Sequence, residues 1–250
     1  MMGIQSIPEH ELARLREKAK EITGSQFDYQ SSYTELLSRR LNGEPLQYIE
    51  EYVPFYSIQI NVDQRCLIPR PETEYMIEII KNNIDMPKKI LDVGTGTGCI
   101  ALMMKKLFLD SEVHAVDISN DALSLAKENA EINNLEVNFY QSDLLSNVET
   151  LDFDLIVANL PYIPTSTLST LNKEVIDHEP LIALDGGEDG RLYIDKLLND
   201  LKNIDSKELV LVLEVDTSHA ESLLSSFTDW EDVKLEKDLV ERDRYIVARK

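Results

Sequence analysis

Beyond residue 88, apolar residues fall into short runs, and stretches with helical spacing lie between them. The runs predict seven strands, at residues 89–93, 112–117, 136–141, 153–158, 208–215, 230–236 and 244–248. Helical spacing predicts helices at residues 72–80, 99–107, 120–133, 190–203 and 218–226. Strands that alternate with helices indicate a mostly parallel sheet covered on both faces. The last two strands have no helix between them, so we expect an antiparallel hairpin there.

The chain before residue 67 has a different pattern. Apolar residues at helical spacing predict helices at residues 8–22 and 29–41. The alternation of Tyr56, Ile58, Ile60 and Val62 predicts a strand, and a turn at Asp63-Gln64 leads back to residues 66–68 as a β-hairpin. We interpret residues 1–66 as a small helical domain with a β-hairpin linker, and residues 67–250 as one α/β domain.

Composition and charge narrow the class of protein. The chain has 250 residues and a net charge of −21, and its Lys and Arg residues form no cluster. Stable nucleic-acid binding needs such clusters and is therefore not expected. Cys66 and Cys99 are far apart and the four histidines are scattered, so we expect neither a disulfide nor a metal site. We find no apolar leader or membrane-spanning run, which predicts a cytoplasmic protein without membrane contact.

A glycine-rich turn follows the first strand of the sheet. It reads Gly94-Thr95-Gly96-Thr97-Gly98, and a helix is expected to begin directly after it. A dinucleotide fingerprint would need its third glycine at position 99, where this chain has Cys99. The pattern resembles the S-adenosylmethionine loop of class I methyltransferases, whose ligand carries no phosphate. The alternative is a glycine-rich turn without a ligand.

Polar residues follow the ends of three further strands. Ligands of open α/β sheets lie beyond the carboxyl ends of the strands, so these residues are expected to meet in one crevice. Asp117 would accept hydrogen bonds from both ribose hydroxyls of the cofactor. Asp143 would accept one from the adenine amine and Leu144 would pack on the ring, although Asp143 could equally cap its own loop.

Asn159-Leu160-Pro161-Tyr162 is the sharpest chemical signal in the chain. An amide or adenine nitrogen is a poor nucleophile because its lone pair is delocalised. A side-chain oxygen of Asn159 and the carbonyl of Leu160 can hold the two N–H groups and aim the lone pair at a methyl donor. Pro161 would make the turn rigid and Tyr162 would supply a planar packing surface. The alternative is a plain turn that leaves the strand.

Several segments together resemble the release factor glutamine methyltransferases. The likeness extends from about residue 37 to the end of the chain, and its most specific part is Ile68-Pro69-Arg70-Pro71-Glu72-Thr73-Glu74. It also includes residues 43–49, 91–101, 159–163, 179–190 and 242–244. Two prolines around Arg70 hold that segment extended.

The resemblance implies a fold, a cofactor and a substrate. The fold is the class I S-adenosylmethionine-dependent methyltransferase fold, an α/β, Rossmann-like sheet of seven strands with an antiparallel C-terminal hairpin. The reaction is methyl transfer from S-adenosylmethionine to the side-chain amide N5 of the glutamine in the Gly-Gly-Gln motif of peptide chain release factors. The N-terminal domain would dock the release factor, the proline-rich segment would lie near the active site, and we expect a monomer.

The chain departs from the family pattern at two places. Leu160 stands where the family usually has proline, and the part before residue 37 is shorter than usual and shows little likeness. Asn-Leu-Pro-Tyr is also similar to the motif of rRNA adenine dimethyltransferases, so a nucleic-acid adenine N6-methyltransferase is the alternative. The net charge and the proline-rich segment oppose it. A module that binds cofactor without turnover is a third interpretation, which the intact motif residues oppose.

Overall fold

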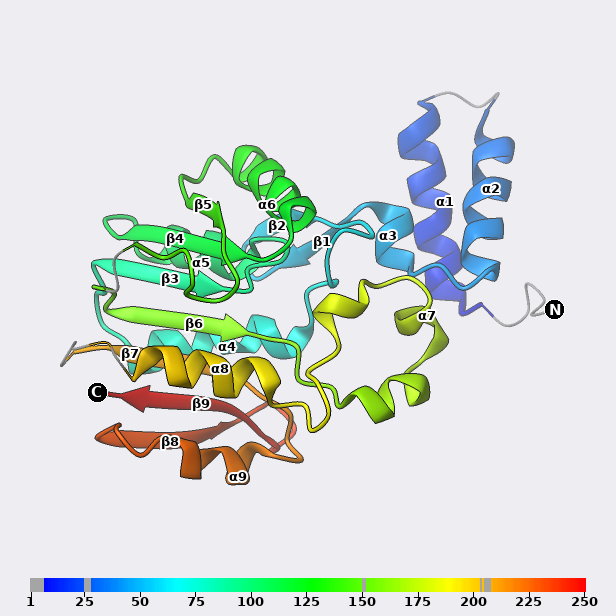
Figure 1. Cartoon of the computed structure of the whole chain (residues 1–250). Coiled ribbons are helices and arrows are strands. Elements are labelled where there is room, and N and C mark those ends of the chain that lie inside the picture. Colours follow the sequence, from blue (N-terminus) through cyan, green and yellow to red (C-terminus); the bar gives the residue numbers. More distant parts are fainter. Residues whose placement is uncertain (1–6, 25–27, 150–151, 203, 205–207) are drawn as a thin grey trace.

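A twisted sheet of seven strands forms the centre of the molecule (Figure 1). The structure, a computed structural model, describes residues 7–24, 28–149, 152–202, 204 and 208–250. The strands are β3 (Lys89–Val93), β4 (Glu112–Asp117), β5 (Asn138–Gln141), β6 (Leu155–Asn159), β7 (Val210–Glu214), β8 (Asp232–Lys237) and β9 (Asp243–Arg249). Their order across the sheet is β5-β4-β3-β6-β7-β9-β8.

The direction of the strands changes at one end of the sheet. The strands from β5 to β7 are parallel, whereas β9 runs antiparallel to both β7 and β8. The predicted C-terminal hairpin is therefore confirmed. The chain proceeds outward from β3 to β5 and then returns to β6 on the other side of β3. This reversal opens a crevice beyond the carboxyl ends of β3 and β6.

Alternate residues of the strands face two separate apolar cores. On one face Ile90 packs with helices α4 (Pro71–Asn83), α5 (Cys99–Leu107) and α6 (Asn120–Asn133). On the other face Leu91 packs with α8 (Leu192–Leu201) and α9 (Ala220–Leu223), and a 3-10 turn, η4 (Leu224–Ser226), follows α9. Because successive side chains of a strand point to opposite faces, a strand buried on both faces must be apolar at nearly every position.

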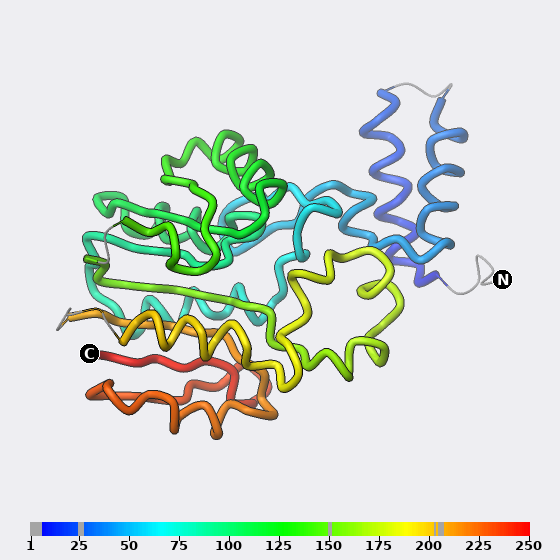
Figure 2. The backbone as a smooth tube through the Cα atoms, viewed as in Figure 1, coloured from blue at the N-terminus to red at the C-terminus, as the bar shows by residue number. Residues whose placement is uncertain are grey.

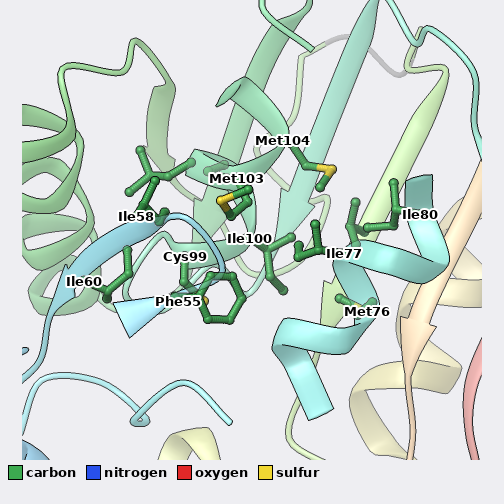
Figure 3. Packing of buried hydrophobic residues seen from close by; sticks show 14 of the residues in the cluster. Phe55, Ile58, Ile60, Met76, Ile77, Ile80, Cys99, Ile100, Met103 and Met104 are labelled. Atoms are coloured by element: carbon green, nitrogen blue, oxygen red, sulfur yellow. The ribbon is translucent and has the colours of Figure 1, made fainter. Parts of the chain in front are cut away.

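A two-stranded hairpin, β1 (Tyr52–Phe55) and β2 (Ile58–Asn61), extends the first of these cores. Its side chains Phe55, Ile58 and Ile60 meet apolar residues of α4 and α5 (Figure 3). The side chain of Asn129 on α6 accepts from the backbone N–H of Asn61 at 2.7 Å and donates to its carbonyl at 3.0 Å. The hairpin is thereby joined to the sheet by packing and by hydrogen bonds.

The position of this hairpin corrects the sequence-based expectation. The predicted strand at residues 56–62 begins within the turn, and residues 66–68 form no strand. Tyr56 has a φ of 53°, a left-handed conformation that belongs to the turn between β1 and β2. The alternation of apolar residues continues across that turn. The pattern therefore predicted one strand over the turn and β2, and it missed β1.

Three helices form a separate layer beside the sheet: α1 (Glu9–Thr23), α2 (Tyr29–Leu41) and α3 (Leu46–Glu50). They share a small core of their own, whose buried members are Leu15, Ala19, Leu36, Leu46 and Ile49. In Figure 1 the α1–α2 pair projects away from the sheet.

Residues 164–190 form a long connection between β6 and α8. It contains only short elements: η2 (Thr165–Thr170), α7 (Lys173–Ile176) and η3 (Leu181–Ala183). Figure 2 shows this segment as a broad loop that reaches the base of the α1–α2 pair, where Glu174 and Arg40 form an ion pair at 3.2 Å. Neither these elements nor α3 was expected from the sequence.

Of the other predicted elements, five agree with the structure to the residue: 29–41, 89–93, 99–107, 112–117 and 120–133. The remaining ones agree in kind and differ at their ends. The helix expected at residues 190–203 is observed as α8, and residue 203 lies outside the described residues. The helix expected at residues 218–226 is divided into α9 and η4. No helix among the described residues is long and apolar enough to cross a membrane.

Candidate active site

The glycine-rich turn connects β3 to α5 and requires glycine at three positions. Gly94, Gly96 and Gly98 have φ angles of 74°, 53° and 82°, a left-handed conformation that side chains with a Cβ rarely adopt. The backbone N–H groups of Gly94 and Thr95 both donate to the carbonyl of Val116 at 2.9 Å. A Cβ on Gly94 would lie 2.9 Å from a methyl group of Leu160. The turn is therefore held against β4 and against the Asn159–Tyr162 segment.

Asp117 ends β4 beside this turn. One carboxylate oxygen accepts from the N–H of Gly96 and the other from the N–H of Ser119, each at 2.9 Å. Burial raises the pKa of Asp117, and these backbone donors oppose the rise because they stabilise the charged form. The carboxylate is thus fixed in place by the backbone of two neighbouring turns.

Asp143 and Leu144 follow β5 on the neighbouring strand end. Leu144 is buried, with a φ of 49°. The carboxylate of Asp143 accepts from the ammonium of Lys196 on α8 at 2.5 Å. This ion pair was not expected from the sequence, since Lys196 lies 53 residues away.

Asn159 is the last residue of β6, and its side chain is turned toward α4. Its Nδ2 donates to the hydroxyl of Thr73 at 2.9 Å. No donor of the described chain is hydrogen-bonded to the carbonyl oxygen of Leu160, which leaves that oxygen able to accept. The hydroxyl of Tyr162 donates to a carboxylate oxygen of Glu214 at 3.1 Å.

One cavity brings most of the predicted site residues together. It lies at the crevice beyond β3 and β6. From the predicted site it is lined by Gly94, Thr95, Gly96, Thr97, Asp117, Asp143, Leu144, Asn159, Leu160 and Pro161. Gly98 and Tyr162 do not line it: Gly98 caps α5, and Tyr162 packs against the core.

Comparison with known proteins identifies the family. The methyltransferase small domain family matches residues 71–188. A release factor glutamine methyltransferase from Koribacter versatilis is 38% identical over 226 residues, which cover 89% of this chain and 81% of that protein. One from Bacillus cereus is 34% identical over 239 residues, covering 92% and 83%. This chain belongs to the release factor glutamine methyltransferase family.

Solved structures agree on the fold. The catalytic domain of hMettl16, solved in complex with an RNA hairpin, has a TM-score of 0.62 at 13% identity and covers 98% of this chain and 93% of its own. A methyltransferase from Pyrococcus furiosus has a TM-score of 0.58 at 21% identity, covering 86% and 98%. The predicted class I methyltransferase fold, with its sheet order and antiparallel hairpin, is confirmed.

The cavity has the chemistry that S-adenosylmethionine requires. Its glycine turn would let the backbone lie close to a bound ligand, and its carboxylates suit ribose hydroxyls and a cationic ligand better than they suit phosphates. Among the described lining residues the one basic side chain is Arg65, and it is already paired with Asp63 and Glu128 at 2.7 Å. The residues of this family member therefore fit the cofactor.

The proline-rich segment forms another part of the cavity wall. Leu67, Pro69 and Thr73 line the cavity. A buried carboxylate, Glu179, accepts from the N–H of Ile68 at 3.1 Å and from the guanidinium of Arg70 at 2.5 Å. Two segments that carry the family resemblance, 68–74 and 179–190, are thus held together.

The glycines at residues 186–190 hold the Asn159–Tyr162 segment from behind. Gly186 donates to the carbonyl of Ile163 at 2.8 Å. A Cβ on Gly186 would lie 2.8 Å from the carbonyl oxygen of Pro161, and one on Gly190 would lie 2.3 Å from that of Tyr162. Only glycine allows the two backbones to approach so closely.

Three polar residues near the cavity were missed by the sequence-based assignment of roles: Thr73, Asp92 and Glu214. Asp92 lies within β3, fully buried, and accepts from the hydroxyl of Thr95 at 2.6 Å and from the N–H of Ala101 at 3.1 Å. Burial raises the pKa of Asp92 to about 7. The sequence did contain a signal for two of them. Asp92 is a single charged residue within an apolar strand run, and Glu214 is an acidic residue at the end of such a run.

Proposed function

We propose that this protein transfers a methyl group from S-adenosylmethionine to the side-chain amide N5 of the glutamine in the Gly-Gly-Gln motif of peptide chain release factors. The observation that carries the proposal is the family relationship over about nine-tenths of the chain. The placement of Asn159 and Leu160 in one cavity with the glycine turn supports it.

The expected chemistry follows from the properties of an amide. Bound S-adenosylmethionine supplies a methyl group attached to a sulfonium. When the methyl group is transferred, the sulfur is the leaving group and becomes a neutral thioether. The side-chain oxygen of Asn159 and the carbonyl of Leu160 accept from the two N–H groups of the glutamine. These contacts orient the nitrogen and polarise it without a strong base. As the S–CH3 bond breaks and the N–CH3 bond forms, the nitrogen becomes cationic, and it then gives one of its two protons to solvent water. The side chain of Leu160 packs on Gly94, so the acceptor segment is positioned relative to the cofactor turn.

We propose the following cofactor contacts. Residues 94–98 provide close backbone contact, Asp117 binds the ribose hydroxyls, Asp143 accepts from the adenine amine, and Leu144 packs on the ring. All of these except Gly98 line the cavity, and Gly98 shapes the turn. Asp143 is already paired with Lys196. To bind adenine, its carboxylate must either accept from both partners at once or lose the contact with the lysine.

We also propose that residues 1–66 dock the release factor and residues 67–250 carry the reaction. The helices α1–α3 have their own core, away from the cavity, and their base contacts the loop at Glu174. Release factors act with cytoplasmic ribosomes, so we propose a cytoplasmic location. We propose that the protein is a monomer. The free thiols of Cys66 and Cys99 are compatible with a reducing compartment.

A transfer assay with labelled S-adenosylmethionine tests this function. Purified release factor and ribosomal RNA are offered separately, and a release factor in which the motif glutamine is replaced by alanine serves as the control. Label on the intact release factor alone supports the proposal. Label on the control protein to the same extent, or on RNA in preference to protein, contradicts it.

A further inference from the structure

Two hydrogen bonds in series link Asn159 to Glu214 at the buried end of β7, and a third joins Glu214 to Tyr162. The Nδ2 of Asn159 lies 2.9 Å from the hydroxyl oxygen of Thr73, and that oxygen lies 2.8 Å from one carboxylate oxygen of Glu214. The hydroxyl of Tyr162 lies 3.1 Å from the other carboxylate oxygen. Glu214 is 1% exposed and Thr73 is 3% exposed. Water is therefore excluded from the centre of the chain.

An ionised Glu214 carboxylate would set the direction of every proton in this chain. A carboxylate only accepts, and a threonine hydroxyl has one proton to donate. Thr73 must therefore donate to Glu214 and accept from Asn159. The group of Asn159 that faces Thr73 must then be its NH2. Its carbonyl oxygen is consequently left for the cavity, where the substrate amide needs an acceptor.

We propose that Thr73 and Glu214 are positioning residues that set the polarity of the Asn159 side-chain amide, so that its oxygen and not its NH2 group faces the substrate. This inference rests on the proposed function for the identity of the substrate. Thr73 brings the family-specific proline-rich segment into the reaction, because the segment supplies the hydroxyl that orients Asn159. Glu214 does not line the cavity, and the hydroxyl of Thr73 is already bonded to Asn159 and Glu214.

Burial and the neighbouring groups act in opposite directions on the charge of Glu214. Arg244 on β9 faces it and also lies over the ring of Tyr162, with 5.9 Å between the guanidinium and the ring centre. The other titratable groups that face Glu214 are Glu72 on α4, Tyr245 on β9, Cys99 on α5 and Tyr162. Burial raises the pKa of Glu214, while Thr73, Arg244 and Tyr162 favour its charged form.

Protonation of Glu214 would reverse the chain. A protonated carboxyl can donate to Thr73, and Thr73 can then donate to the oxygen of Asn159. The NH2 group would face the substrate N–H groups and repel them. The turnover number kcat should therefore fall in acid, as the pH drops through the raised pKa of Glu214, while the affinity for the cofactor stays the same.

Kinetics of Thr73 variants test the proposal. Thr73→Val keeps the shape and removes the hydroxyl, and we expect kcat to fall at least tenfold with the cofactor Kd changed less than twofold. Thr73→Ser should restore most of the activity. Ser111→Ala is the matched control, because Ser111 is a buried residue whose hydroxyl donates to the carbonyl of Pro87 away from the cavity. Full activity of Thr73→Val, or a Thr73→Ser variant as slow as Thr73→Val, would overturn the proposal.

The pH profile separates positioning from a merely structural role. Glu214→Gln removes the titrating group, and we expect it to lower kcat and to abolish the acid fall that the wild type shows. It also serves as the test if Thr73→Val does not fold. An acid fall in Glu214→Gln that matches the wild type would show that Glu214 does not set the state of Asn159.

An NMR measurement makes the outcome independent of the substrate. The side-chain amide of Asn159, assigned by its loss in Asn159→Ala, should exchange slowly in the wild type and rapidly in Thr73→Val. If no methyl reaches glutamine but these exchange rates are found, the proposed function fails and the positioning stands. If glutamine is methylated but Thr73→Val leaves the exchange rate unchanged, the positioning fails and the function stands.

Discussion

At the residue scale, the proposed reaction depends on the side-chain oxygen of Asn159. The reaction needs an acceptor for the substrate N–H, and a truncated side chain supplies none. We expect Asn159→Ala to lower kcat by about a hundredfold or more, the typical cost of losing one placed dipole in an active site. The cofactor Kd from titration calorimetry should change little. An Asn159→Ala variant with wild-type turnover would remove Asn159 from the mechanism.

Asp117 should act on the cofactor instead. Asp117→Ala removes the proposed ribose acceptor and the acceptor for the N–H of Gly96. We expect the cofactor Kd to rise about tenfold or more, a change of about 1.4 kcal/mol. Asp121→Ala, in the first turn of the following helix, is the control. Equal affinities of the two variants would mean that the ribose assignment is wrong.

The buried Asp92 should make stability depend on pH. Its pKa in the folded protein is about 7, against an ordinary value of 3.8, so between these values the folded state holds a proton that the unfolded state has lost. The free energy of unfolding should therefore decrease as the pH rises through this window, by at most about 1.4 kcal/mol per pH unit from this group.

Asp92→Asn removes that titration. In urea unfolding at about pH 5 and about pH 8, the variant should lose less stability than the wild type toward the higher pH. Asp110→Asn, on the surface, controls for the change in net charge. If Asp92→Asn and the wild type show the same slope, Asp92 does not carry this dependence.

At the element scale, the contact between residues 186–190 and the acceptor segment should be essential. Gly190→Ala adds a Cβ 2.3 Å from the carbonyl of Tyr162 and places it at a φ of 77°. We expect kcat to fall because the acceptor segment must move. Gly24→Ala is the matched control, since Gly24 has a φ of 53° with nothing within 4 Å of the added Cβ. It should lose about 1–2 kcal/mol of stability without loss of kcat. Equal kcat values in the two variants would mean that residues 186–190 do not hold the Asn159–Tyr162 segment in position for the reaction.

The proposed docking helices can be tested through their contact with the loop. Arg40 pairs with Glu11 on α1 and with Glu174 on α7, whereas the neighbouring Arg39 pairs with Glu44 nearby in sequence. Arg40→Ala should raise the KM for intact release factor several-fold and leave the rate with a short Gly-Gly-Gln peptide unchanged. Arg39→Ala should change neither. An equal effect of Arg40→Ala on protein and peptide would place the defect in the active site.

At the scale of the whole molecule, the strands of the sheet were predictable and the long connection was not. β3 and β4 were located to the residue because strands buried on both faces read as continuous apolar runs bounded by glycine or charge. Residues 164–190 have no such period, and their short turns are held by contacts with Ile163 and Arg40. Local patterns do not encode those partners.

The same distinction applies to the site. Residues at strand ends converge because the topology of a parallel sheet brings them together, so Asp117, Asp143 and Asn159 could be placed from order alone. The contacts that orient them could not. Thr73 lies 86 residues from Asn159 and 141 residues from Glu214, and these hydrogen bonds follow from packing across the sheet.

The identity of the methylated atom tests the proposed function most directly. Intact release factor is incubated with the wild-type protein and S-adenosylmethionine, and tandem mass spectrometry of its peptides locates the added methyl group. We predict a single methyl group on the side-chain amide of the Gly-Gly-Gln glutamine, absent when Asn159→Ala replaces the wild type. A methyl group on another residue, or transfer to RNA adenine in place of the protein, would contradict the proposed methylation of the release factor glutamine.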